Sequence, residues 1–228
     1  MSGKEVPGDP ERKVNRQTTA ELVAEELRSR IIGGDIGEGE QLHQERLAKE
    51  LGVSRIPLRE AMRQLEAEGL ITISSHRGGV VAVLSLDEIR ELFEIRSCLE
   101  PWLLGLAVPR MTPPDFEDLR RIMDKMQPGE VALWGKLNWE FHQRLYAPAA
   151  RPQTMRILQR LHSNLDRYLR LQISETSGWE AAAGEHDAII EACHAQDVRR
   201  ATALLEVHIM DAADDLVEAL RKRRAATA

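Results

Sequence analysis

Three histidines in the second half of the chain occupy positions that helical patterns reserve for buried apolar residues. His142 follows Asn138 by four residues, while His186 and His208 lie on later helical stretches among isoleucines and leucines. Neutral imidazole nitrogens are common ligands of divalent metals. A core histidine that makes one hydrogen bond is the plainer interpretation of each residue taken alone. Because the sequence does not show whether the three helices converge, both interpretations stay open at this point.

Three arginines form a second group with recognisable chemistry. At roughly 100° per residue, Arg55, Arg59 and Arg63 lie along one edge of a helix, about 40° apart and away from its apolar stripe. Guanidinium groups in this arrangement can face the phosphates and base edges of a nucleic acid. The alternative is a solvated basic edge whose arginines pair with Glu60 and Glu66.

The helical spacing of apolar residues predicts three short helices that position these arginines, over about 18–33, 44–51 and 55–68. Ala48, Gly52 and Leu58 fall at the spacing of a helix-turn-helix, in which a small residue lets two helices approach and a glycine makes the tight turn. Ser54 can cap the third helix. Pro57 falls within the first turn of that helix, where a missing N–H is tolerated.

A hairpin and then a long helical region follow. The β-branched runs 71–73 and 80–83 flank a glycine-bearing tip. Ser85 and Glu88 have the spacing of a capping box, which marks a new helix and a new domain. Proline, glycine and serine breaks divide the remainder into about six helices. The predicted fold is mainly α, with a flexible arm at 1–16, a winged helix-turn-helix domain of three helices plus a β-hairpin wing at 17–84, and an all-α six-helix bundle at 85–228.

Composition and charge limit the class of protein. The chain is 43% hydrophobic and 30% charged, which is ordinary for a soluble globular protein. No apolar run approaches the roughly 20 residues of a membrane span, and the first residues are polar, so we expect a cytoplasmic protein without a membrane partner. A net charge of −6 argues against a nucleic-acid partner, but residues 46–77 carry six basic and four acidic side chains. The basic surface is therefore local.

The stretch from Leu47 to Ile71 resembles the winged helix of GntR-type bacterial transcription regulators. The matching segments are Leu47-Ala48, Leu51-Gly52-Val53-Ser54-Arg55-Ile56-Pro57-Leu58-Arg59-Glu60-Ala61-Met62 and Leu65-Glu66-Ala67-Glu68-Gly69-Leu70-Ile71. The resemblance implies that arginines of the recognition helix contact operator DNA and that the wing tip enters the minor groove. We therefore expect DNA contacts from Arg46, Ser54, Arg55, Pro57, Arg59, Arg63, His76, Arg77 and Gly78. Glu45 departs from the family, which often has arginine there.

Nearly all of the remaining chain resembles the helical effector domain of the FadR subgroup, the FCD type. The matching segments are Glu94-Ile95-Arg96 with Leu99-Glu100, Asn138-Trp139-Glu140-Phe141-His142, Glu185-His186-Asp187-Ala188-Ile189 and His208. Metal-containing members hold a divalent ion with one aspartate and three histidines, which correspond here to Asn138, His142, His186 and His208. Zinc is the first expectation, and nickel, iron or manganese are the others. With an amide in place of the carboxylate, we expect weaker binding that depends on an anionic ligand; a metal-free pocket that binds an effector by hydrogen bonds is the alternative.

Both resemblances imply a transcription regulator and not an enzyme. We expect a homodimer that represses transcription from an inverted-repeat operator, with its DNA affinity controlled by a small organic acid bound in the helical domain. Arg96 can anchor the carboxylate of this effector, although a surface salt bridge with Glu100 explains the arginine equally well. Two other functions stay open: a regulator for which the metal ion itself is the signal, and a metal-dependent enzyme that uses the histidines. No nucleophile and base pair is identifiable for the enzyme.

Overall fold

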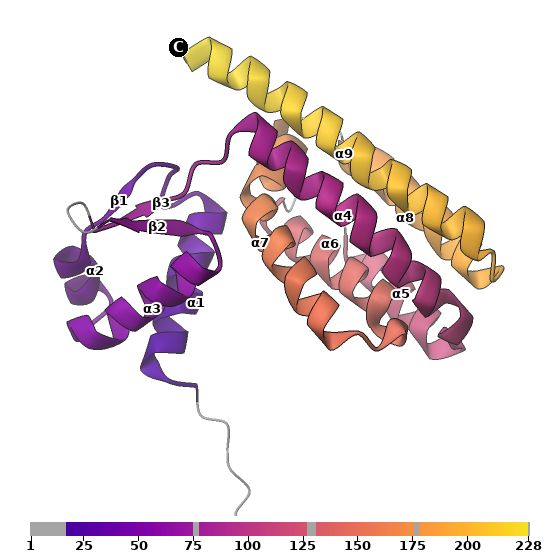
Figure 1. Cartoon of the computed structure of the whole chain (residues 1–228), viewed down its shortest axis with the longest axis horizontal. Coiled ribbons are helices and arrows are strands. Elements are labelled where there is room, and N and C mark those ends of the chain that lie inside the picture. Colours follow the sequence, from indigo (N-terminus) through magenta and orange to yellow (C-terminus); the bar gives the residue numbers. More distant parts are fainter. Residues whose placement is uncertain (1–16, 75–77, 127–130, 176–177, 228) are drawn as a thin grey trace, which may run out of the picture.

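The computed structural model describes residues 17–74, 78–126, 131–175 and 178–227. Two separate hydrophobic clusters hold these residues together, one between Val23 and Val81 and the other between Ile89 and Leu220. Figure 1 shows them as a small region of helices and strands and a larger region of long helices, joined by an extended linker. The expected arm at 1–16 lies outside the described residues, and the expected domain limits stay predictions.

Three helices build the first region: α1 (Thr19–Gly33), α2 (Gln44–Glu50) and α3 (Arg55–Ala67). Gly52 turns the chain between α2 and α3 with a φ of +65°, a conformation that favours glycine. Ser54 stands at the N-cap of α3, but its side chain makes no capping hydrogen bond, so the expected cap is wrong in that respect. The buried stripe of α3 is Leu58, Ala61, Met62 and Leu65, which leaves its arginines on the outer face.

A three-stranded antiparallel sheet completes this region, in the order β1 (Gln41–Leu42), β3 (Gly78–Val81), β2 (Ile71–Ser74). The hairpin was expected, but β1 was not, because two residues are too few to show a strand period. A Cβ atom at Gly79 would lie 2.3 Å from Cε of Met62. The glycine therefore leaves room for the side chain of Met62 between the sheet and α3.

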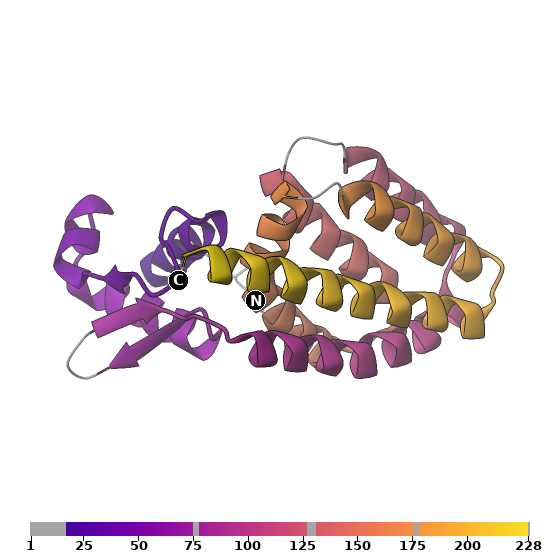
Figure 2. The ribbon, with the colours of Figure 1, turned by 90° about the horizontal axis from the view of Figure 1, so that it is seen from above.

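Six helices form the second region over the described residues, as expected: α4 (Leu86–Ala107), α5 (Pro113–Lys125), α6 (Val131–Tyr146), α7 (Pro152–Glu175), α8 (Gly178–His194) and α9 (Val198–Thr227). Short 3-10 turns follow α4 at Val108–Arg110 and α6 at Ala147–Ala149. The expected capping box of Ser85 and Glu88 begins α4. Helices α4 and α9 pack together along much of their length (Figures 1 and 2). Their interior faces meet those of α6, α7 and α8 in one core.

Helices α7 and α9 hold the linker between the two regions. Arg167 donates from Nη2 to the carbonyl oxygen of Ala82 at 2.5 Å, and the hydroxyl of Tyr168 accepts from the amide of Leu84 at 2.9 Å. Arg224 donates to the carbonyl of Leu84 at 2.7 Å. The linker is thus bonded to the helical region through its backbone. Among the described residues, no helix has the length and apolar character to cross a membrane.

Candidate functional site

The three histidines singled out from the sequence meet in the interior of the helical region. His142 comes from α6, His186 from α8 and His208 from α9, and one ring nitrogen of each lies within 4.8 Å of the others. They are 0%, 0% and 8% exposed, respectively. Inward helical positions were expected from the spacing, and the structure now brings the three rings together. Their role as metal ligands stays a prediction.

Four buried polar atoms at this cluster have no hydrogen-bond partner among the described residues. They are Nε2 of His142, both ring nitrogens of His186 and Oδ1 of Asn138. Asn138 lies one turn before His142 and is 6% exposed. A buried polar atom without a partner costs about 1–3 kcal/mol, so a group of four at one place suggests a ligand. Imidazole nitrogens with one amide oxygen suit zinc or another first-row divalent metal.

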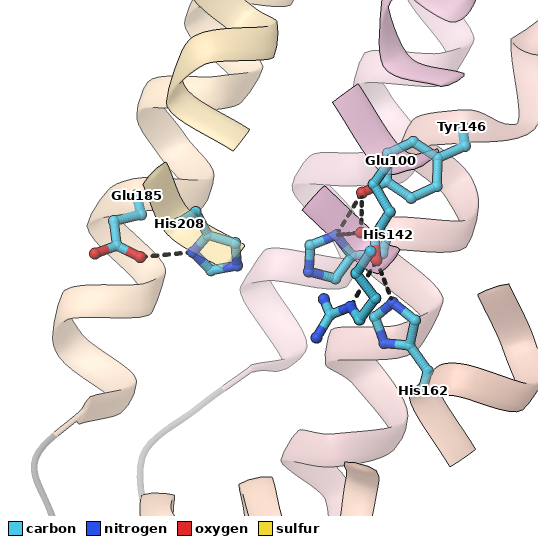
Figure 3. Close-up of polar contacts among 7 residues, drawn as sticks. Glu100, His142, Tyr146, His162, Glu185 and His208 are labelled. Atoms are coloured by element: carbon cyan, nitrogen blue, oxygen red, sulfur yellow. Dashed lines mark hydrogen bonds and ion pairs between the residues drawn. The ribbon is translucent and has the colours of Figure 1, made fainter. Parts of the chain in front are cut away.

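Glu185 on α8 orients His208. Its Oε2 lies 2.6 Å from Nδ1 of His208, as Figure 3 shows. A carboxylate can only accept, so Nδ1 carries a proton, and Nε2 is the nitrogen that is left to bind a metal. Metal-binding histidines are commonly held by a carboxylate in this way.

Burial keeps two of the histidines neutral. It lowers the pKa of His142 and of His186 well below the usual value, because a charged ring loses its hydration in the interior. Glu100 opposes this shift at His142 without overcoming it. The neutral ring is the form that binds a metal.

Glu100 on α4 is a fully buried carboxylate beside the histidines. It accepts from Nε of Arg96 at 2.6 Å and from the hydroxyl of Tyr146 at 2.6 Å, and its Oε1 lies 3.0 Å from Nε2 of His162. Burial alone would raise the pKa of Glu100, but the charge of Arg96 and the interactions with His162 outweigh it and hold this pKa well below its usual range. The expected surface salt bridge of Arg96 therefore exists, but it is buried: the two side chains are 3% and 0% exposed.

A cavity of about 70 Å³ adjoins the cluster. Its apolar lining includes Trp134, Leu169 and Ile209. Its polar lining consists of one cation, three carboxylates and two neutral groups: Arg96, Glu185, Asp211, Asp215, Asn138 and His208. At roughly 30 Å³ for one water molecule, the volume accommodates a group about the size of a carboxylate. Arg96 thus borders the cavity while its Nε stays bonded to Glu100.

The outer face of α3 is a second candidate site. Arg55, Arg59 and Arg63 are all exposed, and neither Arg59 nor Arg63 has an ion-pair partner within the described part of the chain. The alternative pairing with Glu60 and Glu66 is not found. The carboxylate of Glu66 instead accepts from the amide of Ile73 at 3.0 Å.

Arg55 and Arg46, which were also expected to contact DNA, each form an ion pair with an acidic residue. Arg55 lies 2.5 Å from Glu45, the position at which the chain departs from the family, and Arg46 lies 3.6 Å from Glu40. Pairs this exposed are weak, so both arginines can exchange their partner for a phosphate. Ser54, with its free hydroxyl, is exposed at the start of α3 beside partly buried Pro57.

The wing is described only in part. Gly78 begins β3 with a φ of +71°. His76 and Arg77, which were also expected to contact DNA, lie outside the described residues.

Sequence reasoning missed Tyr146, His162 and the buried role of Glu100. Tyr146 lies four residues after His142 and Glu100 lies four after Arg96, so each pair was visible as neighbours on one helix. What was not visible is that α4, α6 and α7 bring the pairs into one hydrogen-bonded group (Figure 3).

Comparison with known proteins assigns both regions. Residues 19–81 match the family model "Bacterial regulatory proteins, gntR family", and residues 91–211 match the model of the FCD domain. The regulator BphR of Paraburkholderia xenovorans is 28% identical over 86% of this chain and 84% of its own. The HTH-type transcriptional repressor GlaR of Escherichia coli is 26% identical over 81% and 89%.

A solved structure agrees with the fold. McbR/YncC of E. coli superposes with a TM-score of 0.77 at 20% identity, over 90% of this chain and all of that one. With two family models that together span both regions, the chain belongs to the GntR-type bacterial transcription regulators with an FCD domain, and it is a DNA-binding regulator and not an enzyme.

Proposed function

We propose that this regulator is a repressor that binds an inverted-repeat operator as a homodimer, and that a small organic acid bound at a divalent metal controls its DNA affinity. The proposal of a metal rests on one observation: buried nitrogen and oxygen atoms of α6 and α8 that have no hydrogen-bond partner among the described residues lie close to His208. The Nδ1 atom of His208 is itself bonded to Glu185. The cavity beside them supports an acid of small size.

Asn138, His142, His186 and His208 would hold the metal. When bound, it supplies a Lewis-acid centre that takes a carboxylate of the effector. The donor set carries no formal charge, because the rings are neutral and Asn138 is an amide. An anionic effector then compensates the charge of the ion, and Arg96 at the cavity adds a cation suited to the same acid.

One side of α4 supports a dimer. Leu92, Ile95, Leu99 and Trp102 recur along it at alternating spacings of three and four residues, with Leu92 and Leu99 partly buried against the core. Ile95 is 37% exposed and Trp102 is 50% exposed. A second copy packed on this face would cover both and carry two recognition helices to the two halves of an operator.

Elemental analysis tests the metal. Protein purified without a polyhistidine tag or a chelator should contain about one divalent ion per chain, and His186→Ala should lose it because a neutral ligand is removed. His194→Ala is the matched control, since His194 is an exposed histidine of the same helix. Equal metal content in the wild type and His186→Ala would dismiss the site.

The small cavity favours a second candidate, in which the ion alone is the signal. Titration with zinc, without any organic acid, separates the two. If zinc alone changes the affinity for a DNA site selected from a random library, the ion is the signal. If the change needs a screened organic acid in addition, the organic-effector proposal stands.

A further inference from the structure

Tyr146 links the histidine cluster to the buried carboxylate of Glu100. The tyrosine is fully buried one turn after His142 on α6. Its hydroxyl oxygen lies 3.0 Å from Nδ1 of His142 and 2.6 Å from Oε2 of Glu100. Figure 3 shows the three side chains as a triangle, in which Nδ1 of His142 also lies 3.7 Å from Oε2 of Glu100.

The direction of these hydrogen bonds follows from the chemistry of the groups. Glu100 is ionised against Arg96 at 2.6 Å, so it can only accept, and the single hydroxyl proton of Tyr146 is donated to it. The hydroxyl oxygen then faces Nδ1 of His142 with a lone pair. A hydrogen bond at 3.0 Å forms there only if Nδ1 carries the proton.

A neutral imidazole has one N–H, so a protonated Nδ1 leaves the lone pair of His142 on Nε2. Nε2 is also the atom of His142 that lacks a partner among the described residues. His208 has the same tautomer for a parallel reason, since Glu185 accepts from its Nδ1. Two histidines on different helices are therefore held with the same nitrogen free.

We propose that Tyr146 and Glu100 are positioning residues that fix His142 in the Nδ1–H tautomer and thereby prepare its Nε2 to bind a divalent metal. Arg96 and His162 belong to this device because both bond Oε1 of Glu100, which leaves Oε2 to accept from Tyr146. A buried carboxylate is costly, and an apolar side chain would fill the space at lower cost, so a role in orienting the histidine gives a reason for its presence. The metal part rests on the proposed function; the tautomer does not.

The tautomer can be measured without any metal. Long-range ¹H–¹⁵N correlation spectra of the imidazoles, recorded on the full chain in the presence of a chelator, distinguish the two neutral forms. We expect an Nδ1–H ring for His142 in the wild type and a loss of this preference in Tyr146→Phe, which keeps the ring but removes the hydroxyl. An Nε2–H ring in the wild type overturns the proposal, and this result does not depend on whether the variant folds.

Zinc affinity is the second measurement, by competition with a chromophoric chelator. Tyr146→Phe should weaken zinc binding by about 10- to 100-fold, which is the usual effect of removing a partner of a metal-binding histidine. Tyr168→Phe is the matched control, because Tyr168 is the other tyrosine of the chain and bonds the linker instead. Equal zinc affinity of the two variants overturns the proposed role of Tyr146 in positioning His142. A wild type that binds no zinc overturns the proposed function and leaves the tautomer as the deciding measurement.

Discussion

Asn138 determines the charge that the candidate metal site contributes. Its amide oxygen lies on the inner face of α6 without a hydrogen-bond partner among the described residues, one turn from His142. Because the histidines are neutral, this one side chain decides whether the donor set has a formal charge of zero or −1. The affinity for a dication and its dependence on an added anion should therefore change together.

Asn138→Asp is expected to raise zinc affinity by at least about tenfold, or roughly 1.4 kcal/mol, because a full negative charge then faces the ion at short range. The gain in zinc affinity on adding acetate, which stands in for the effector carboxylate, should shrink in the same variant. Chelator competition with and without acetate measures both effects. Asn164→Asp adds the same charge on a different helix, α7, and should change neither the zinc affinity nor the effect of acetate. An equal gain in this control would assign the effect to the overall charge of the protein.

His162 gives a prediction for the dependence of stability on pH. It is buried against Glu100 and Arg96 of α4, and its ring contacts that of Trp139 of α6 in a tilted arrangement. Burial, with a contribution from Arg96, lowers its pKa from 6.5 to about 4. The unfolded chain then binds more protons than the folded chain between these values, so stability falls as pH decreases from 6.5 to 4. The loss is on the order of 3 kcal/mol from this residue.

Urea unfolding of the metal-free protein, followed by circular dichroism at several pH values, measures this loss. His162→Gln should reduce the change in the free energy of unfolding with pH, because glutamine can still donate to Glu100 but does not gain a proton. His194→Gln replaces an exposed histidine and should leave the slope unchanged. A slope that is the same in both variants would show that the acid sensitivity arises elsewhere.

At the scale of elements, α3 presents its arginines because its apolar stripe faces the core. Arg59→Ala should weaken binding to a selected operator by about 1–3 kcal/mol if Arg59 reads a base edge. Arg160→Ala removes an exposed arginine from α7 and serves as the charge control. Gel-shift titrations at fixed salt concentration compare the variants. An affinity of Arg59→Ala equal to that of Arg160→Ala contradicts a role for Arg59 in recognition.

Helix α7 contacts both the buried carboxylate and the linker. His162 faces Glu100, and Tyr168, six residues later on the same helix, accepts from the amide of Leu84. Tyr168→Phe removes the acceptor of this amide. Because a hydrogen bond contributes about 0.5–1.5 kcal/mol, its loss should speed the hydrogen exchange of the Leu84 amide by roughly two- to tenfold. Amide exchange monitored at Leu84 tests this. Tyr146→Phe should leave the exchange at Leu84 as it is, and an equal increase there would mean that both substitutions merely loosen the core.

The elements that the sequence predicts are those with local signals. The turn at Gly52 and the capping box of Ser85 and Glu88 are encoded within a few residues, and both were expected and are present. Strand β1 has no such signal, since it exists only through its pairing with β3. The residue pattern alone could not predict the meeting of the histidines for the same reason: the helical period tells which way His142 points, but not which helix faces it. Only the resemblance to the FCD domain implied that they meet.

At the scale of the whole molecule, the net charge of −6 hides a small basic surface. Residues 1–84 carry a net charge of −2 and residues 85–228 one of −4, so even the DNA-binding half is acidic overall. We expect the basic residues near the end of α9, which lie on another helix, not to add to this surface. Arg221 and Lys222 form ion pairs with Glu218, and Arg224 is bonded to the linker. Contact with DNA therefore depends on few cations.

Few cations within an acidic molecule predict weak non-specific DNA binding. Because each phosphate contact releases counterions, few contacts also predict a shallow dependence of this binding on salt. In titrations of random DNA over a range of potassium chloride concentrations, Arg63→Ala should reduce the slope of log affinity against log salt by about one for each recognition helix bound. The double substitution Arg221→Ala with Lys222→Ala removes more charge from the far end of the chain and should leave the slope unchanged. If the tail substitutions reduce the slope as much as Arg63→Ala, the basic end of α9 contacts DNA, and the operator surface is larger than α3 and the wing.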